Sequence, residues 1–220
     1  MTTKTRSKFN FSELVLNWFD ESGRKDLPWQ INPSPYRVWI SEIMLQQTQV
    51  NTATPYYLRF MDSFPDIYSL SSASTDRVMH HWSGLGYYAR ARNLHKTSKI
   101  VQEEYNGMIP LDFDRLVELP GIGKSTAGAI LSLSDNQRHP ILDGNVKRVL
   151  ARFHAIEGWP GIKKIENKLW HFAEQHLPKK RMADYTQAMM DLGATICTRS
   201  KPNCMDCPLQ EKKIINENKN

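Results

Sequence analysis

Two acidic residues stand in sequence contexts that suit acid–base chemistry. Glu42 lies in SEIMLQQT, between Ile40 and Ile43, in a segment whose apolar residues recur at helical spacing. A carboxyl group in apolar surroundings loses solvation, which raises its pKa and suits it to donate a proton. From spacing alone, a first-turn glutamate that complements the helix dipole is the commoner explanation. Asp143, just before Gly144, is a placed carboxylate that serves either as an ordinary helix N-cap or as an anion for catalysis.

A glycine turn lies upstream of Asp143, in the stretch LPGIGKSTAGAILSL. Gly121 to Gly123 separates two segments with helical spacing, and Pro120 ends the first of them. A glycine turn that opens a helix leaves backbone N–H groups free to hold a phosphate. Short glycine motifs have many false positives, so on the glycines alone a packing unit of two helices is the commoner explanation.

Length and charge bound the class of protein. The 220 residues suffice for one large domain or two small ones that share a core, and 40% of them are hydrophobic. Lys and Arg number 29 against 23 Asp and Glu, and the pI of about 9.2 suggests a polyanionic partner without establishing DNA. No apolar run approaches the ~20 residues that span a bilayer. The polar, basic segment 1–8 argues against a secretory signal, so we expect a cytoplasmic protein.

The apolar pattern predicts helices almost throughout. Strand alternation is nearly absent, so we expect an all-α fold of roughly ten helices after a mobile arm at residues 1–10. The predicted helices span residues 11–20, 39–48, 55–64, 73–82, 88–106, 112–119, 125–134, 145–154, 163–176 and 184–197.

Several blocks together resemble a known family. LPGIGKSTAGAILSL followed by PILDGNVKRVLAR resembles the helix–hairpin–helix and Gly/Pro–Asp loop of the DNA glycosylase superfamily, most of all the adenine glycosylases of the MutY family. LPWQ, SEIMLQQTQV, GLGYYARARNLH and QAMMDLGATICTRSKPNC agree at matching spacing. The resemblance covers residues 11 to about 209. It implies a six-helix lobe over residues 27–137, a second lobe from residues 1–26 and 138–220, and a DNA groove between them.

The resemblance also implies catalytic roles. Glu42 would protonate adenine at N7, while Asp143 would stabilise the oxocarbenium sugar, with Asn145 as support or simply as a helix cap. Ser125 occupies the position where related glycosylase/lyases carry an attacking lysine, and a hydroxyl forms no Schiff base. We therefore expect a mainly monofunctional enzyme, with Lys147 as a candidate to trap the opened sugar.

Flipping a base requires a pocket, a wedge and phosphate contacts. By resemblance, the base pocket comprises Trp29, Gln30, Leu45, Ser125 and Gln187. The residues expected to wedge into the duplex or contact it are Gln46, Gln47, Tyr87, Gly121, Gly123, Lys124, Arg199 and Lys201. Arg90 and Arg92 are expected to meet phosphates. Trp29, Tyr87 and Tyr88 have an alternative as core aromatics, which we favour for Tyr88.

The three cysteines form a metal-like motif with a defect. Cys197-x6-Cys204-x2-Cys207 is clustered and odd in number, which indicates metal ligation rather than disulfides. The family's 4Fe–4S loop continues x5-Cys, but Lys213 stands at that position. A 4Fe–4S cluster with another fourth ligand, a 3Fe–4S cluster, zinc and no metal all stay open. Without metal, we expect the loop to fray and DNA affinity to fall.

The resemblance therefore predicts an adenine DNA glycosylase that acts, as a monomer, on double-stranded DNA with A opposite G or 8-oxoguanine. The family usually continues into a C-terminal domain that reads 8-oxoguanine, so this chain is expected to be a piece of a longer protein or a naturally short form with weaker discrimination. Two alternatives stay open: a thymine or uracil mismatch glycosylase on the same scaffold, and a mismatch-binding protein without catalysis.

Overall fold

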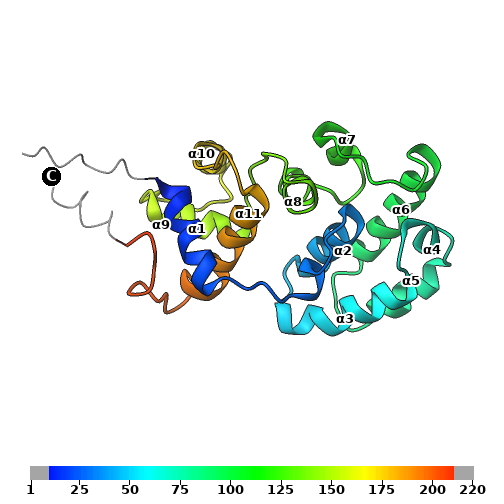
Figure 1. The fold of residues 1–220 in the computed structure, drawn as a ribbon. Helices are drawn as coiled ribbons and strands as arrows, with labels where there is room; N and C mark the ends of the chain where they lie inside the picture. The colour runs from blue at the N-terminus through cyan, green and yellow to red at the C-terminus, as the bar shows by residue number, and fades with distance from the viewer. Residues whose placement is uncertain (1–9, 211–220) are drawn as a thin grey trace, which may run out of the picture. The chain divides into compact units, whose positions relative to one another are not determined.

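The structure, a computed structural model, describes residues 10–210, and Figure 1 shows its helices. The described residues contain no strand, which confirms the all-α class. The α-helices are α1 (Phe11–Ser22), α2 (Pro35–Leu45), α3 (Val50–Ser63), α4 (Ile67–Ser71), α5 (Thr75–Trp82), α6 (Ala89–Glu104), α7 (Phe113–Glu118), α8 (Lys124–Asp135), α9 (Gly144–Phe153), α10 (Lys163–Gln175) and α11 (Met182–Asp191). A 3-10 turn, η1 (Pro28–Gln30), precedes α2, and a π-helical turn, η2 (Leu192–Ile196), follows α11. Most of the predicted arm at residues 1–10 lies outside the described residues.

The chain divides into two compact units. The first is continuous and comprises residues 25–141, with helices α2 to α8. The second combines the N-terminal residues up to 24 with residues from 142 onward, and it contains α1, α9, α10 and α11. The continuous unit holds seven α-helices rather than six, because the five-residue helix α4 was not predicted from the sequence.

Aromatic side chains fill the core of the unit 25–141. Trp39, Tyr57, Phe60, Phe64 and Trp82 are all fully buried. Helix α2 packs against α8, and α4 packs against α6, so the core is enclosed by amphipathic helices. Burial of such large rings dominates the hydrophobic stabilisation of a small unit.

Helix α2 begins earlier and ends earlier than its apolar pattern predicts. Pro35 occupies the first turn, where its missing N–H is not needed, and Ser34 Oγ accepts a hydrogen bond from Arg37 N at 3.2 Å. The helix ends at Leu45. Glu42 therefore lies well past the first turn, and the interpretation of Glu42 as a first-turn glutamate is wrong.

The hairpin between α7 and α8 is a tight turn held against α6. Gly121 has a φ of 83°, and a Cβ at this position would lie 2.9 Å from Asn93 Cβ. Thr97 Oγ1 donates to the carbonyl of Pro120 at 2.8 Å. The turn therefore has a fixed position on its own unit.

The second unit packs α1 against α11, and α9 against α10, α11 and η2. Arg24 and Asp191 tie the end of the N-terminal segment to α11, with Arg24 Nη2 at 2.5 Å from Asp191 Oδ1. Among the described residues of both units, we find no helix with the length and apolar character that a membrane span requires.

Candidate active site

Asp143 caps helix α9 and is surrounded by N–H donors. Its Oδ1 accepts from the backbone N–H of Val146 at 2.8 Å, and its Oδ2 accepts from Asn145 Nδ2 at 3.2 Å. Burial raises the pKa of Asp143, whereas hydrogen bonds from Val146 and Asn145 and the charge of Arg148 lower it. The prediction of an N-cap is confirmed. The same contacts also hold a carboxylate in one fixed orientation at a helix N-terminus.

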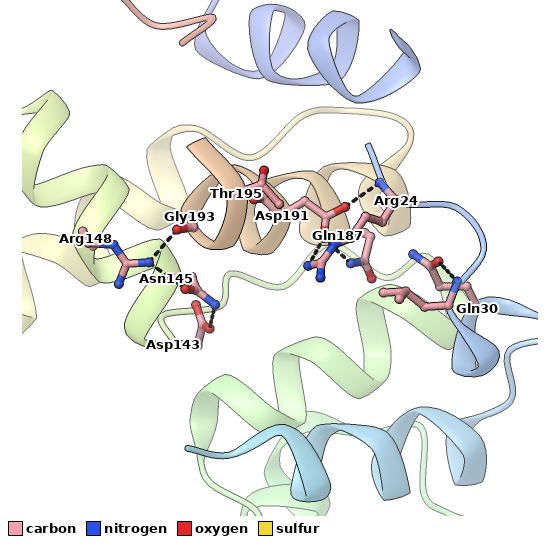
Figure 2. A network of polar contacts seen from close by, with 10 residues as sticks. Arg24, Gln30, Asp143, Asn145, Arg148, Gln187, Asp191, Gly193 and Thr195 are labelled. Carbon is pink, nitrogen blue, oxygen red and sulfur yellow. Dashed lines mark hydrogen bonds and ion pairs between the residues drawn. The ribbon is translucent and has the colours of Figure 1, made fainter. Parts of the chain in front are cut away.

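Asn145 is oriented by a second layer of contacts, which Figure 2 shows. Arg148 Nη2 donates to Asn145 Oδ1 at 2.8 Å and to the carbonyl of Gly193 at 2.6 Å. The amide oxygen is thereby occupied, so the amide N–H is the end that faces Asp143. Gly193 permits this arrangement, because a Cβ there would lie 2.5 Å from Asn145 Cβ.

Gln187 on α11 is fixed in a comparable way. Its Nε2 donates to Asp191 Oδ1 at 2.9 Å, and Asp191, which is fully buried, also accepts from the backbone N–H and Nε of Arg24 at 2.8 and 2.9 Å. Gln187 is itself 5% exposed. Since Nε2 donates to Asp191, the amide oxygen of Gln187 is the end that can accept a hydrogen bond.

Glu42, together with Trp29 and Leu45 of the predicted base pocket, lies in the unit 25–141. Glu42 is half-buried, and its neighbours Ser41 and Ile43 are buried. Trp29 is buried and packs edge-on against Tyr57, with ring centroids 5.4 Å apart, as a core aromatic would. Leu45 is half-buried at the end of α2.

Gln30, also in this unit, closes the η1 turn. Its Oε1 accepts from the backbone N–H of Leu27 at 2.9 Å. The contact fixes the conformation of the LPWQ segment, which places Trp29 in the core.

The predicted wedge residues project from two loops. Gln47 is exposed with a φ of 56°, and Gln46 beside it is half-buried. Tyr87 is 60% exposed with a φ of 49°. Tyr88 is 41% exposed, so our assignment of Tyr88 to the core is wrong. The prediction for Arg90 is also wrong, because its guanidinium points inward to backbone carbonyls instead of outward to phosphates.

The N-terminus of α8 places backbone N–H groups next to a cation. Gly123 is the N-cap and, without a side chain, gives no side-chain cap to the first N–H groups of the helix. Lys124 is exposed at the first helical position, and Ser125 is half-buried behind it. This end of the hairpin has the composition of an anion site.

Arginines of α9 bind the start of the segment 197–207, which carries the three cysteines. Arg152 Nη1 donates to Cys197 Sγ at 3.3 Å and to the carbonyl of Thr198 at 2.7 Å, and Arg148 Nε donates to the carbonyl of Cys197 at 2.5 Å. Cys204 is exposed, and all three thiols are free.

Within residues 10–210, no three His, Cys, Asp or Glu side chains converge as metal ligands. The described thiols therefore do not fit a metal centre as a set. Lys213, which stands at the family's fourth cysteine position, lies outside the described residues. Arg199 and Lys201 are exposed on this segment.

Sequence reasoning missed three residues that fix Asn145 and Gln187: Arg148, Asp191 and Gly193. Arg148 had a signal, since it follows Asn145 by three residues on a helix, where side chains meet. Asp191 lies four residues after Gln187 on α11 and had the same signal. Gly193 had none, because only the packing of η2 on α9 shows why a side chain is excluded there.

Curated relatives are similar in sequence to this chain over most of the chain's length. An adenine DNA glycosylase of Buchnera aphidicola from Acyrthosiphon pisum is 53% identical over 208 residues, 94% of this chain and 59% of that protein. The adenine DNA glycosylase of Homo sapiens is 41% identical over 209 residues, 91% of this chain and 38% of that protein. The chain thus spans about three-fifths of the length of its Buchnera relative.

Solved structures share the fold. A thermostable thymine-DNA glycosylase superposes with a TM-score of 0.81 at 25% identity, covering 92% of this chain and 95% of that one. An endonuclease III in a non-covalent complex with DNA superposes with a TM-score of 0.76 at 20% identity, covering 93% and 95%. The second similarity concerns the fold alone.

The family profile of HhH-GPD superfamily base excision DNA repair proteins matches residues 40–175, which is more than half of the chain. This span contains Glu42, the Gly121–Gly123 hairpin and Asp143. The chain therefore belongs to the HhH-GPD superfamily of base excision DNA repair proteins.

Proposed function

We propose that this chain carries the catalytic portion of an adenine DNA glycosylase, which hydrolyses the N-glycosidic bond of adenine opposite guanine or 8-oxoguanine. The observation that carries the proposal is the 53% identity, over 94% of the chain, to a protein named for that activity. The capped carboxylate of Asp143 supplies the chemistry that such a reaction needs.

Loss of a purine leaves a sugar with oxocarbenium character, which an adjacent anion stabilises. Asp143 is suited to this role, because the N–H groups of Val146 and Asn145 hold its carboxylate in one orientation and favour its charged form, against the burial that raises its pKa. Asn145 keeps the carboxylate in place, and Arg148 fixes the amide of Asn145. Glu42, in the middle of α2, acts in this proposal as the acid that protonates adenine at N7.

Specificity for adenine is supported by Gln187. Because Gln187 Nε2 donates to Asp191 Oδ1, the amide oxygen at the other end is the acceptor in this proposal. The exocyclic amine of adenine is a matching donor. Within the unit 25–141, the residues proposed to contact the base are Trp29, Gln30, Leu45 and Ser125. The proposed DNA contacts include Gly121, Gly123, Lys124, Arg199 and Lys201.

Release of the base without strand cleavage is the expected outcome. Ser125 has no amine with which to attack the sugar, and Lys147 Nζ is paired with Glu166 Oε1 at 2.7 Å. No step of the proposal passes through a metal at Cys197, Cys204 and Cys207.

Single-turnover excision on duplexes with A, T or U opposite G, and with A opposite 8-oxoguanine, tests the proposal. We expect release of adenine alone. Glu42→Gln and Asp143→Asn should each abolish release and retain DNA binding. Asp112→Asn is the matched control, since Asp112 caps α7 in the same way but is exposed. Wild-type excision by either variant would show that the roles are misassigned.

A thymine or uracil mismatch glycosylase is the second candidate, favoured by the structural similarity to a thymine-DNA glycosylase. Release of T or U, with adenine retained, would select it. A wild-type protein that binds mismatches but releases no base would instead select the non-catalytic alternative.

A further inference from the structure

Two exposed loops of the unit 25–141 hold a non-glycine residue in the left-handed backbone region. Gln47, after the end of α2, has a φ of 56°, and Tyr87, before α6, has a φ of 49°. Both side chains are exposed, and Tyr87 is a large aromatic at 60% exposure. Such a conformation is strained for a residue with a Cβ and persists only where other contacts impose it.

One guanidinium supplies contacts to both loops. Arg90, in the first turn of α6, is half-buried, and its Nη1 donates to acceptors at the end of α2 while its Nη2 donates to the loop before α6. The acceptors of Nη1 are the carbonyls of Ile43 at 2.9 Å, Met44 at 2.9 Å and Gln46 at 2.7 Å, with Thr48 Oγ1 at 3.3 Å. The acceptors of Nη2 are the carbonyls of Leu85 at 3.3 Å and Gly86 at 3.1 Å.

The same guanidinium also supports the aromatic ring of the second loop. Arg90 Cζ lies 5.5 Å from the ring centroid of Tyr87 and 5.3 Å from that of the fully buried Trp82. Trp82 Nε1 donates to the carbonyl of Gly86 at 3.1 Å. The charged group thus connects the core, the carbonyl end of α2 and the exposed tyrosine.

These contacts satisfy carbonyls that the end of α2 would otherwise leave unpaired. They also commit both terminal nitrogens of Arg90 inside the protein. A guanidinium whose two terminal nitrogens are both engaged in this way cannot form the bidentate hydrogen bonds with which arginine binds a phosphate.

We propose that Arg90 is a positioning residue, which locks the Gln46–Gln47 turn and the Gly84–Tyr87 loop into one rigid element that enters the DNA duplex. This inference rests on the proposed function, because it assumes that the two loops act on DNA. Arg90 itself contacts no DNA. Its role is to keep Gln47 and Tyr87 in the conformation that separates the base pair.

Arg90→Lys is the decisive variant, because lysine keeps the charge but a single ammonium cannot reach the acceptors of both loops. Duplexes that carry 2-aminopurine beside the target adenine report base separation by fluorescence. We expect Arg90→Lys to lose the fluorescence rise and about tenfold of its affinity for mismatched duplex, the equivalent of one charge-assisted hydrogen-bond contribution. Affinity for matched duplex and its salt dependence should stay unchanged. A phosphate contact would lower both kinds of affinity together.

Arg59→Lys is the matched control, since Arg59 is an exposed arginine of α3 in the same unit and has no assigned role in DNA binding. We expect it to retain the fluorescence rise. If Arg90→Lys also retains this rise and the mismatch affinity, the positioning role is rejected. If the wild-type protein gives neither a fluorescence rise nor adenine release, the proposed function fails, and the positioning role falls with it.

Two further measurements test the positioning role without an excision assay, and the second of them needs no variant. Hydrogen exchange of free Arg90→Lys should be faster at residues 45–49 and 83–88 than in the wild type, with α8 unchanged. Side-chain NMR of 15N-arginine in the wild-type protein should show Arg90 unmoved when mismatched duplex binds. A phosphate-type shift of the Arg90 signals on binding would overturn the proposal.

Discussion

Lys147 Nζ lies 2.7 Å from Glu166 Oε1, in an ion pair that joins α9 to α10. Lys147 is the amine nearest to Asp143 along the chain, four residues after it on the same helix. The hydrogen bond and the charge of Lys147 lower the pKa of Glu166, so the pair is charged at neutral pH. The Lys147 amine is thereby held against Glu166 of α10.

Glu166→Gln should release Lys147 to trap opened abasic sugars. Both side chains are just over a quarter exposed, and such pairs contribute about 0.5–1 kcal/mol. We therefore expect borohydride trapping on abasic-site DNA to rise by roughly two- to fivefold. Lys147→Ala should remove the rise. Equal trapping by the wild type and Glu166→Gln would show that the ion pair does not restrain the amine.

The pKa of Asp143 predicts a pH-dependent effect on stability. Burial raises the folded-state pKa above the ordinary 3.8, so the folded state binds the proton more tightly than the unfolded state. The stability from this group is present below pH 3.8 and is lost as pH rises through the folded pKa. The free energy of unfolding of the wild type, relative to Asp143→Asn, should fall across that window. Denaturant titrations at a series of pH values measure it, and a rise with pH would mean that the hydrogen bonds to the carboxylate outweigh its burial.

Gly193→Ala should disturb the site without touching a charged group. The new Cβ would lie 2.5 Å from Asn145 Cβ and 2.8 Å from its Cα, so η2 must move away from α9. Overpacking of this kind costs about 1–3 kcal/mol, a fall in thermal midpoint of roughly 3–10 °C. Single-turnover excision should fall too, because Asn145 is displaced. Gly144→Ala is the control, since a Cβ there meets nothing within 4 Å.

The sequence predicted the elements whose signals are local. Asp143 before Gly144 indicated the cap of α9, and Gly121 the turn of the hairpin, and both are present. The boundaries of α2 were missed, although Ser34 and Pro35 were a readable start signal. Helix α4 is too short to show a period, so its apolar residues gave no pattern.

The contacts and exposure of individual side chains were harder to predict. Arg90 and Arg92 look alike in the string YARAR, yet Arg90 donates to six acceptors at the end of α2 and in the two loops. Sequence spacing does not show which carbonyls a fold leaves unpaired. Tyr88 was expected in the core for the same reason, because two adjacent tyrosines give no sign of which one the loop turns outward.

The segment around Cys197 should keep its conformation when metal is removed. Arg148 Nε and Arg152 Nη1 donate to the carbonyls of Cys197 and Thr198, so α9 holds the start of the segment by itself. We expect chelators to leave hydrogen exchange at residues 197–203 unchanged, in contrast to the fraying that the sequence suggested. Arg152→Met should accelerate exchange there, because it removes the donor to Cys197 Sγ and Thr198.

Arg181→Met controls for the loss of an exposed arginine elsewhere in the same unit, where it pairs with Asp20 and Asp184. It should leave exchange at residues 197–203 as in the wild type. Iron and zinc analysis before and after chelation completes the experiment, because it shows what was removed. A chelator that extracts stoichiometric metal and also loosens residues 197–203 would mean that metal, rather than α9, holds the segment.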